Sequence, residues 1–308
     1  MRYSFIVASS GLLATVSGHG LVTSIQGANG VTMPGLSVAD GTPRDCSSNG
    51  CGSQADTAII RDSELGSDKA SALGRTQGNG PIDAATMISS FMGNGTAPKN
   101  NGAAASAGVE DDVKGKAAGG ADKAKRSLLA RALSDFFTGL TGGGADAGTK
   151  TETAQETNVA AKAGEGASSG LPTCADDGSI TMTFRQINQD GAGPMTADVD
   201  GTSGGTDPDA FQSVEVTQNV PGAGFGGLSL ATNTDFPMTV QMPAGMTCDG
   251  TVAGVDNVCV VRVRNNALAG PFGGSAAFTM SAGAQKRALA YRLKKRAEQA
   301  SNQNRRLR

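Results

Sequence analysis

The sequence predicts a mainly β protein: an antiparallel immunoglobulin-like β-sandwich with an N-terminal loop-rich block, short helices and a long low-complexity insertion. Three observations predict it. Residues 171–282 alternate apolar and polar side chains in the way half-buried strands do. No βαβ alternation or phosphate-cradling glycine loop is found, which argues against a nucleotide-binding fold. The 308-residue chain contains 45 glycines, many of them in turn motifs between the apolar segments.

The first 18 residues have the organisation of a secretory signal peptide. Arg2 supplies a positive charge, an interrupted apolar stretch follows from Phe5 to Val16, and Gly18 is a small residue at the expected cleavage site. The stretch is too short to span a bilayer, which needs about 20 apolar residues. A buried N-terminal helix is the alternative. We expect a secreted protein, extracellular or cell-wall associated, whose mature chain begins at His19.

Residues 19–96 are expected to form the first part of the β-sandwich domain. The block is rich in turn pairs such as Asp40-Gly41. One helix is predicted from Ile82 to Met92, with Asp83 near its start. Asn94 begins an N-glycosylation motif and is expected on an exposed loop.

Residues 97–170 form a low-complexity insertion dominated by Ala, Gly, Ser and Lys. Such a stretch buries too little apolar surface to offset the entropy of ordering it. The exception is 127–140, where leucines and phenylalanines recur at helical spacing behind a candidate cap at Ser127. This amphipathic helix either docks onto the domain or is a free element for a partner or a membrane surface.

Residues 171–282 are predicted to form the second part of the β-sandwich domain. Glycine- and proline-containing turns separate its apolar segments. Strands are expected around Ile180–Phe184 and Val214–Gln218, and at Phe236–Met242, Val258–Arg264 and Ser275–Met280.

Residues 283–308 form a basic tail. The segment 285–308 holds nine Lys or Arg and one Glu, a charge of +8, whereas the whole chain carries −2. The rest of the chain therefore sums to −10. We interpret the tail as solvated and partly disordered, with a weak basic helix as the alternative. A basic tail on an acidic body favours contact with an anionic surface.

Aromatic residues are scarce in this chain. It has no Trp, and its two tyrosines, Tyr3 and Tyr291, lie in the signal peptide and the tail. Because sugars and bases usually stack on Trp or Tyr, any ligand site in the body must work differently. We expect no nucleic-acid partner.

Five cysteines fit an exported chain that uses a few disulfides. Cys46 and Cys51 could close a small loop, and so could Cys248 and Cys259. Cys174 would then be unpaired, although the sequence alone does not fix the connectivity. An unbridged thiol inside a core is the alternative.

Several separate motifs resemble one family. They are the run from His19 to Cys46, Gly74-Arg75-Thr76-Gln77, Gln189–Pro194, Val216–Pro221 and Ala267–Gly274. In this order they resemble the appressorium-associated secreted virulence factors of pathogenic fungi, the Gas/Mas-type cell-surface proteins. The resemblance implies an extracellular or cell-surface location, a role in host penetration, and the host surface or fungal cell-wall polysaccharide as partner. It implies no settled biochemical activity.

This family is more distantly similar to the copper-dependent lytic polysaccharide monooxygenases, which begin at a histidine freed by signal cleavage. The α-amine and ring Nδ1 of His19 could together bind one Cu(II). Those enzymes add a second histidine, yet this chain has one histidine in total. The resemblance places Arg185 at the position of that second ligand, where a permanent cation cannot coordinate a metal.

We therefore expect a non-catalytic protein with at most weak copper binding at His19, unless that side chain only packs at the domain edge. The alternative function is a copper-dependent oxidative enzyme acting on polysaccharide. A further set of acidic residues either binds Ca²⁺ or is simply solvated: Asp190, Asp198, Asp200, Asp207 and Asp209.

Overall fold

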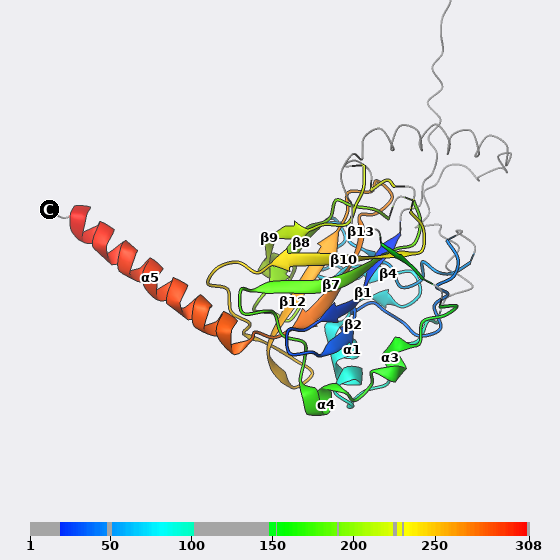
Figure 1. The fold of residues 1–308 in the computed structure, drawn as a ribbon, viewed down its shortest axis with the longest axis horizontal. Helices are drawn as coiled ribbons and strands as arrows, with labels where there is room; N and C mark the ends of the chain where they lie inside the picture. Colours follow the sequence, from blue (N-terminus) through cyan, green and yellow to red (C-terminus); the bar gives the residue numbers. More distant parts are fainter. Residues whose placement is uncertain are drawn as a thin grey trace, which may run out of the picture.

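The structure is a computed structural model that describes residues 19–47, 51–101, 148–151, 153–189, 191–223, 227–229 and 231–306. It confirms a mainly antiparallel β protein with few helices (Figure 1). The predicted signal peptide and the predicted helix 127–140 lie outside the described residues.

Thirteen strands of the described residues join one hydrogen-bonded sheet in the order β2-β1-β7-β10-β9-β8-β12-β13-β3-β4-β5, with β11 on β12 and β6 on β10. Every strand pair is antiparallel. In chain order the strands are β1 (Gly20–Gln26), β2 (Thr32–Pro34), β3 (Ala58–Ile59), β4 (Arg75–Thr76), β5 (Gly80–Pro81), β6 (Thr149–Lys150), β7 (Ser179–Gln186), β8 (Thr196–Asp200), β9 (Phe211–Gln218), β10 (Thr234–Gln241), β11 (Gly250–Val252), β12 (Val255–Arg264) and β13 (Phe272–Phe278).

The sheet folds over itself at β9. The first half of this strand, from Phe211 to Val214, pairs with β8, and its second half, from Glu215 to Gln218, pairs with β10. A strand that changes partner in this way turns a corner between two layers. The two layers are therefore joined through β9 into one continuous hydrogen-bonded sheet.

The two layers bury the apolar residues that the alternation predicted. In β7, Ile180, Met182 and Phe184 are all buried. The segment 258–263 of β12 is buried at every position, which places it in the middle of the core. Burial of these side chains, worth about 1.5–3 kcal/mol for each large apolar residue, holds the layers together.

The last strand begins earlier than the sequence suggested. We expected this strand to begin at Ser275, but β13 starts at Phe272. A Cβ on Gly274 would lie 2.5 Å from the backbone nitrogen of Val22 in β1. Glycine here permits the close approach of β13 to β1 rather than a turn.

The helices agree with the sequence at α1 and differ at the tail. They are α1 (Ala84–Phe91), α3 (Asn158–Ala161), α4 (Gly166–Ser169) and α5 (Ala282–Arg306), with a 3₁₀ turn η1 (Pro208–Ala210). The Asp83 side chain accepts a hydrogen bond from the Ala85 amide at 2.9 Å and so caps α1, as predicted. Asn94, just after α1, is exposed and accessible to modification.

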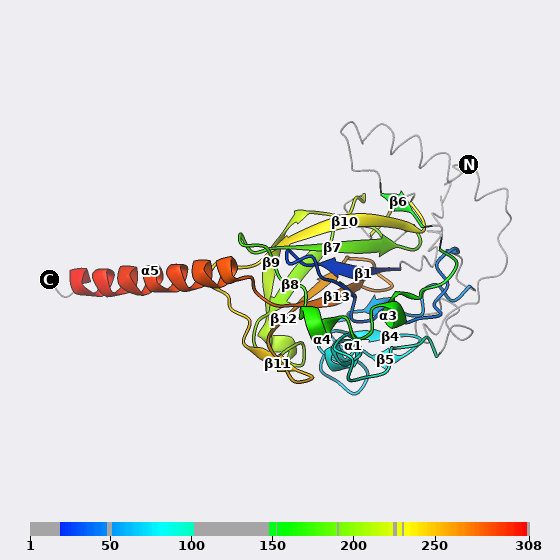
Figure 2. The same ribbon diagram turned by 60° about the horizontal axis from the view of Figure 1, so that its bottom comes forward.

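The basic tail is a 25-residue helix, so the partly disordered interpretation was wrong. After Gly283 the segment contains no Gly or Pro and is rich in Ala, Leu, Lys, Arg and Gln, which favour helix. Leu289 and Leu293 are 59% and 56% exposed, and α5 projects away from the body (Figures 1 and 2). Among the described residues, no helix combines the length and the apolar character that a bilayer crossing requires.

The structure contains both expected disulfides, Cys46–Cys51 and Cys248–Cys259. Cys174 is a buried free thiol. Burial raises the pKa of this thiol, so at neutral pH it stays protonated and unreactive.

The insertion ends earlier than expected. Strand β6 pairs with β10 (Figure 2), and Glu156 and Val159 are buried, although all three lie in the stretch 97–170 that we expected to pack poorly. Residues 148–170 therefore belong to the folded body. Composition alone did not reveal this, because the few buried residues of this stretch are separated by small and polar residues.

Candidate functional site

The extended segment 40–44 lies between the two ends of the insertion. On one side Asp40 forms a bridge with Lys99, and on the other Pro43 forms a bridge with Gln155. The Arg44 amide donates to the Ala154 carbonyl at 2.9 Å. This pairing brings residues 154–158 against the N-terminal block and places Glu156 beside Arg44.

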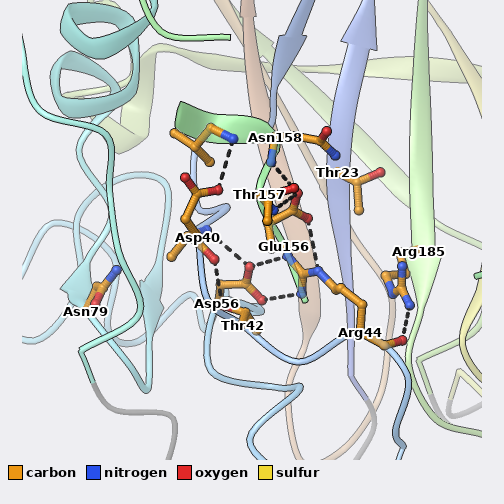
Figure 3. Close-up of polar contacts among 12 residues, drawn as sticks. Thr23, Asp40, Thr42, Arg44, Asp56, Asn79, Glu156, Thr157, Asn158 and Arg185 are labelled. Atoms are coloured by element: carbon orange, nitrogen blue, oxygen red, sulfur yellow. Dashed lines mark hydrogen bonds and ion pairs between the residues drawn. The ribbon is translucent and has the colours of Figure 1, made fainter. Parts of the chain in front are cut away.

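Arg44 is the centre of a buried ion network (Figure 3). Its Nη1 and Nη2 donate to the two carboxylate oxygens of Asp56 at 2.9 and 2.5 Å, and its Nε donates to Glu156 Oε2 at 3.0 Å. The three residues are 2%, 1% and 6% exposed. Burial alone would lower the pKa of the Arg44 guanidinium, but the two carboxylates outweigh burial and raise it. The arginine is therefore charged at every accessible pH.

Two carboxylates in this region also fix the helix α3. Asp40 accepts hydrogen bonds from the amides of Val159 and Ala160 at 3.0 and 2.8 Å. Glu156 Oε1 accepts from the amides of Thr157 and Asn158 at 3.2 and 3.0 Å. These bonds satisfy the first amides of α3 and lock the chain after β6 in place.

A second charged pair extends the network toward β7 and β10. Arg185 Nη2 donates to the Arg44 carbonyl (Figure 3), and Arg185 Nη1 lies 3.7 Å from Asp235 Oδ1. Thr151 donates to the other Asp235 oxygen at 3.0 Å. Burial lowers the pKa of Arg185 and raises that of Asp235, in both cases despite the attraction between the two groups. The attraction between Arg185 and Asp235 therefore does not fully offset the cost of removing both charges from water.

A cavity of about 310 Å³ opens over these groups. Its walls come from β1, β2, β7, β10 and the chain from 151 to 162. Hydroxyl, amide and charged side chains dominate the lining; among the described residues that form it, Pro34 is the one apolar member and none is aromatic. The lining residues are Thr23, Ser24, Thr32, Pro34, Arg44, Thr151, Thr153, Gln155, Glu156, Thr157, Asn158, Lys162, Thr183, Arg185 and Asp235.

His19 does not line this cavity. It is 1% exposed, and its ring lies against Phe272 with the ring centroids 4.5 Å apart. The His19 backbone nitrogen donates to Asn188 Oδ1 at 2.6 Å, and the ring Nδ1 lies 3.5 Å from Asn188 Nδ2. The two nitrogens that would chelate copper in the mature chain therefore both face Asn188.

These residues do not fit a three-nitrogen copper site. The chain has a single histidine, and Arg185, which the resemblance placed at the position of a second ligand, directs its guanidinium to Arg44 and Asp235. Within the described part of the chain, no group of three or more His, Cys, Asp or Glu side chains is arranged to hold a metal ion.

The acidic residues of the second block divide into two groups: Asp198 and Asp200 have structural partners inside the fold, whereas Asp207 and Asp209 are exposed to solvent. Asp198 pairs with Arg262 at 3.1 Å, and exposed Asp207 accepts from the Asp209 amide at 2.9 Å. Asp200 is fully buried and accepts five hydrogen bonds from residues 202–205. Asp190 lies outside the described residues.

The fold and the site define an antiparallel β protein whose polar cavity is built on a buried arginine–carboxylate network. The chain belongs to the Egh16-like virulence factors, whose family model matches residues 17–273. It therefore has a virulence-associated role, and the family resemblance read from the motifs is confirmed.

Two curated relatives support this assignment. The appressoria-specific virulence factor GAS2 of Pyricularia oryzae is 54% identical over 298 residues, covering 96% of this chain and 95% of the relative. The appressoria-specific virulence factor GAS1 of the same organism is 40% identical over 129 residues, covering 41% of this chain and 50% of the relative. No solved structure matches the chain.

Sequence reasoning missed most of the cavity residues. It singled out Arg185, but as the replacement of a metal ligand, and it passed over Arg44, Glu156 and Asp235. A charged residue beside a turn or in a low-complexity stretch is usually solvated, so nothing local marks these three. The one usable signal was that Arg44 lies inside the long N-terminal family motif.

Proposed function

We propose that this chain is a secreted protein that acts at the surface between fungus and host during penetration, and that it binds surface polysaccharide without modifying it. The observation that carries the proposal is the polar cavity over the Arg44 network. Polysaccharides present many hydroxyl groups, and the cavity presents hydroxyl, amide and charged groups that can form hydrogen bonds with them.

The rigidity of the cavity supports a binding role. The ion network and the α3 caps hold its walls together from segments far apart in sequence. A site whose groups are already fixed loses little conformational entropy when a ligand arrives. Host-surface or fungal cell-wall polysaccharide is the partner that this chemistry favours.

Polysaccharide depletion tests the proposal. Mature protein is mixed with insoluble chitin, cellulose, xylan or β-glucan, and the protein left in solution is measured. We expect at least one polymer to deplete the wild type. Thr153→Arg, which places a long side chain at the cavity rim, should abolish depletion, whereas the matched surface variant Thr251→Arg on β11 should not. Equal depletion by both variants, or none by any polymer, would contradict the proposal.

The helix α5 supports a second contact. From Leu289 to Arg305 its side chains are exposed, and the tail carries a charge of +8 against the −10 of the remaining chain. We propose that α5 helps to hold the protein to an anionic surface by charge attraction. Such a contact should weaken as salt is raised from 50 to 500 mM, whereas binding in the cavity should persist.

Copper binding is expected to be weak. Correctly processed protein that begins at His19 offers one amine and one ring nitrogen, and Asn188 already bonds the backbone nitrogen. Titration calorimetry with Cu(II) should therefore give an affinity well below the nanomolar range, and His19→Ala should remove it. A nanomolar Kd for the wild type would overturn this expectation and reopen the oxidative alternative.

A further inference from the structure

Two residues that line the cavity each have one buried polar atom that the described protein does not satisfy. Arg185 Nε and Asp235 Oδ1 are both buried atoms without a hydrogen-bond partner. Arg185 is 3% exposed, and both residues line the cavity. Buried polar groups in folded proteins nearly always have partners, so these two atoms mark a place where a ligand or water completes the site.

Arg185 Nε and Asp235 Oδ1 remain without hydrogen-bond partners because the ion pair between the two residues is long. Arg185 Nη1 lies 3.7 Å from Asp235 Oδ1, beyond hydrogen-bonding distance. The remaining contacts do not close the gap, because Arg185 Nη2 bonds to the Arg44 carbonyl and Asp235 Oδ2 bonds to Thr151. The shifted pKa values of both groups agree with this picture, since burial outweighs the attraction between them.

The charges around this point select the class of ligand. An anionic group that reached Arg185 would also face the Asp235 carboxylate. A cationic group that reached Asp235 would face Arg185, with Lys162 also in the lining. A neutral hydroxyl avoids both conflicts, because its oxygen accepts from the guanidinium while its proton is donated to the carboxylate.

We propose that Arg185 and Asp235 together bind a hydroxyl group of a neutral oligosaccharide in this cavity. The threonine hydroxyls of the walls provide further contacts with neighbouring sugar hydroxyls, and hydrogen bonds to charged groups replace the aromatic stacking that the site lacks. This inference rests on the proposed function and narrows it: neutral sugar chains are ligands and uronic-acid chains are not.

Titration of the mature protein with soluble oligosaccharides tests the inference. The probes are the hexamers of cellulose, xylan, chitin and β-1,3-glucan, with hexagalacturonate as the anionic comparison. We expect one or more neutral hexamers to bind and hexagalacturonate to bind at least tenfold more weakly. Preferential binding of hexagalacturonate would overturn the inference while leaving polysaccharide binding intact. If no hexamer binds and no insoluble polymer depletes the protein, the proposed function itself fails.

Variants at Asp235 test whether the sugar hydroxyl binds to Arg185 and Asp235. Asp235 is 31% exposed, so Asp235→Leu should fold, and a circular dichroism spectrum like that of the wild type would show it. We expect a tenfold or greater loss of neutral-hexamer affinity, with partial recovery in Asp235→Asn, which keeps an acceptor oxygen. Asp249→Leu, remote from the cavity, is the matched control and should bind normally. Unchanged affinity in Asp235→Leu would overturn the assignment.

Discussion

Replacing Arg44 with methionine is expected to lower the free energy of unfolding by about 3–5 kcal/mol, measured by urea denaturation. Methionine approximates the aliphatic part of the side chain but leaves Asp56 and Glu156 without their cation. The two carboxylates are 1% and 6% exposed, so water cannot replace the lost guanidinium. One of them must then take up a proton or draw water into the interior, and either change destabilises the fold.

A charge-neutral combination separates this effect from a packing defect. Arg44→Met together with Glu156→Gln removes one of the uncompensated charges and should recover part of the lost stability. Lys162→Met is the matched control, because Lys162 forms an exposed pair with Glu165 and should change stability by less than about 1 kcal/mol. If Arg44→Met is no worse than Lys162→Met, the network does not stabilise the fold.

Replacing Asp200 with alanine is expected to lower stability by about 3 kcal/mol. The Asp200 carboxylate is fully buried at the end of β8 and accepts hydrogen bonds from Thr202, Ser203 and Gly205. Alanine leaves several of those donors unpaired, and the loop after β8 loses its anchor. Asp207→Ala removes an exposed cap in the same region and should lose less than about 1 kcal/mol.

The pH dependence of stability gives an independent test of the role of Asp200. Burial alone would raise the pKa of Asp200, but hydrogen bonds from Ser203, Thr202 and Gly205 outweigh burial and hold it below the ordinary value for aspartate. A lowered folded-state pKa stabilises the protein above the pKa of unfolded aspartate, and this contribution is lost as pH falls through the folded value. Asp200→Asn should therefore show a shallower decline of Tm below pH 4 than the wild type. Parallel curves would contradict this account.

The sequence predicted those elements whose signal is local. The alternation from Ile180 to Phe184 predicted β7, and Asp83 predicted the start of α1. Strand β1 was not predicted. Its pairing with β7 shifts register between Val22 and Ser24, and this irregularity interrupts the simple alternation of buried and exposed side chains. The charge of the tail correctly indicated solvation, but it also suggested partial disorder, whereas helix propensity decided the local structure in favour of the alternative, a helix.

The candidate site could not be predicted in the same way. Arg44 and Glu156 are separated by 112 positions in the chain, and only the pairing of the segment 40–44 with residues 154–156 brings them together. Arg185 and Asp235 meet because β7 and β10 are neighbours in the sheet with these two residues directly opposite. Such contacts depend on the register between strands that are far apart in the sequence, and composition and periodicity do not specify that register.

The anchoring of both ends of the insertion on the segment 40–44 has a consequence for variation among relatives. Lys99 is bridged to Asp40, Gln155 is bridged to Pro43 and β6 pairs with β10, so the described chain on either side of residues 102–147 is held by contacts of the body itself. The entropy of closing a loop grows only logarithmically, by about 0.6 kcal/mol for each doubling. This edge is therefore a position that tolerates insertions: a segment can be lengthened, shortened or exchanged during evolution while the cavity beside it stays intact.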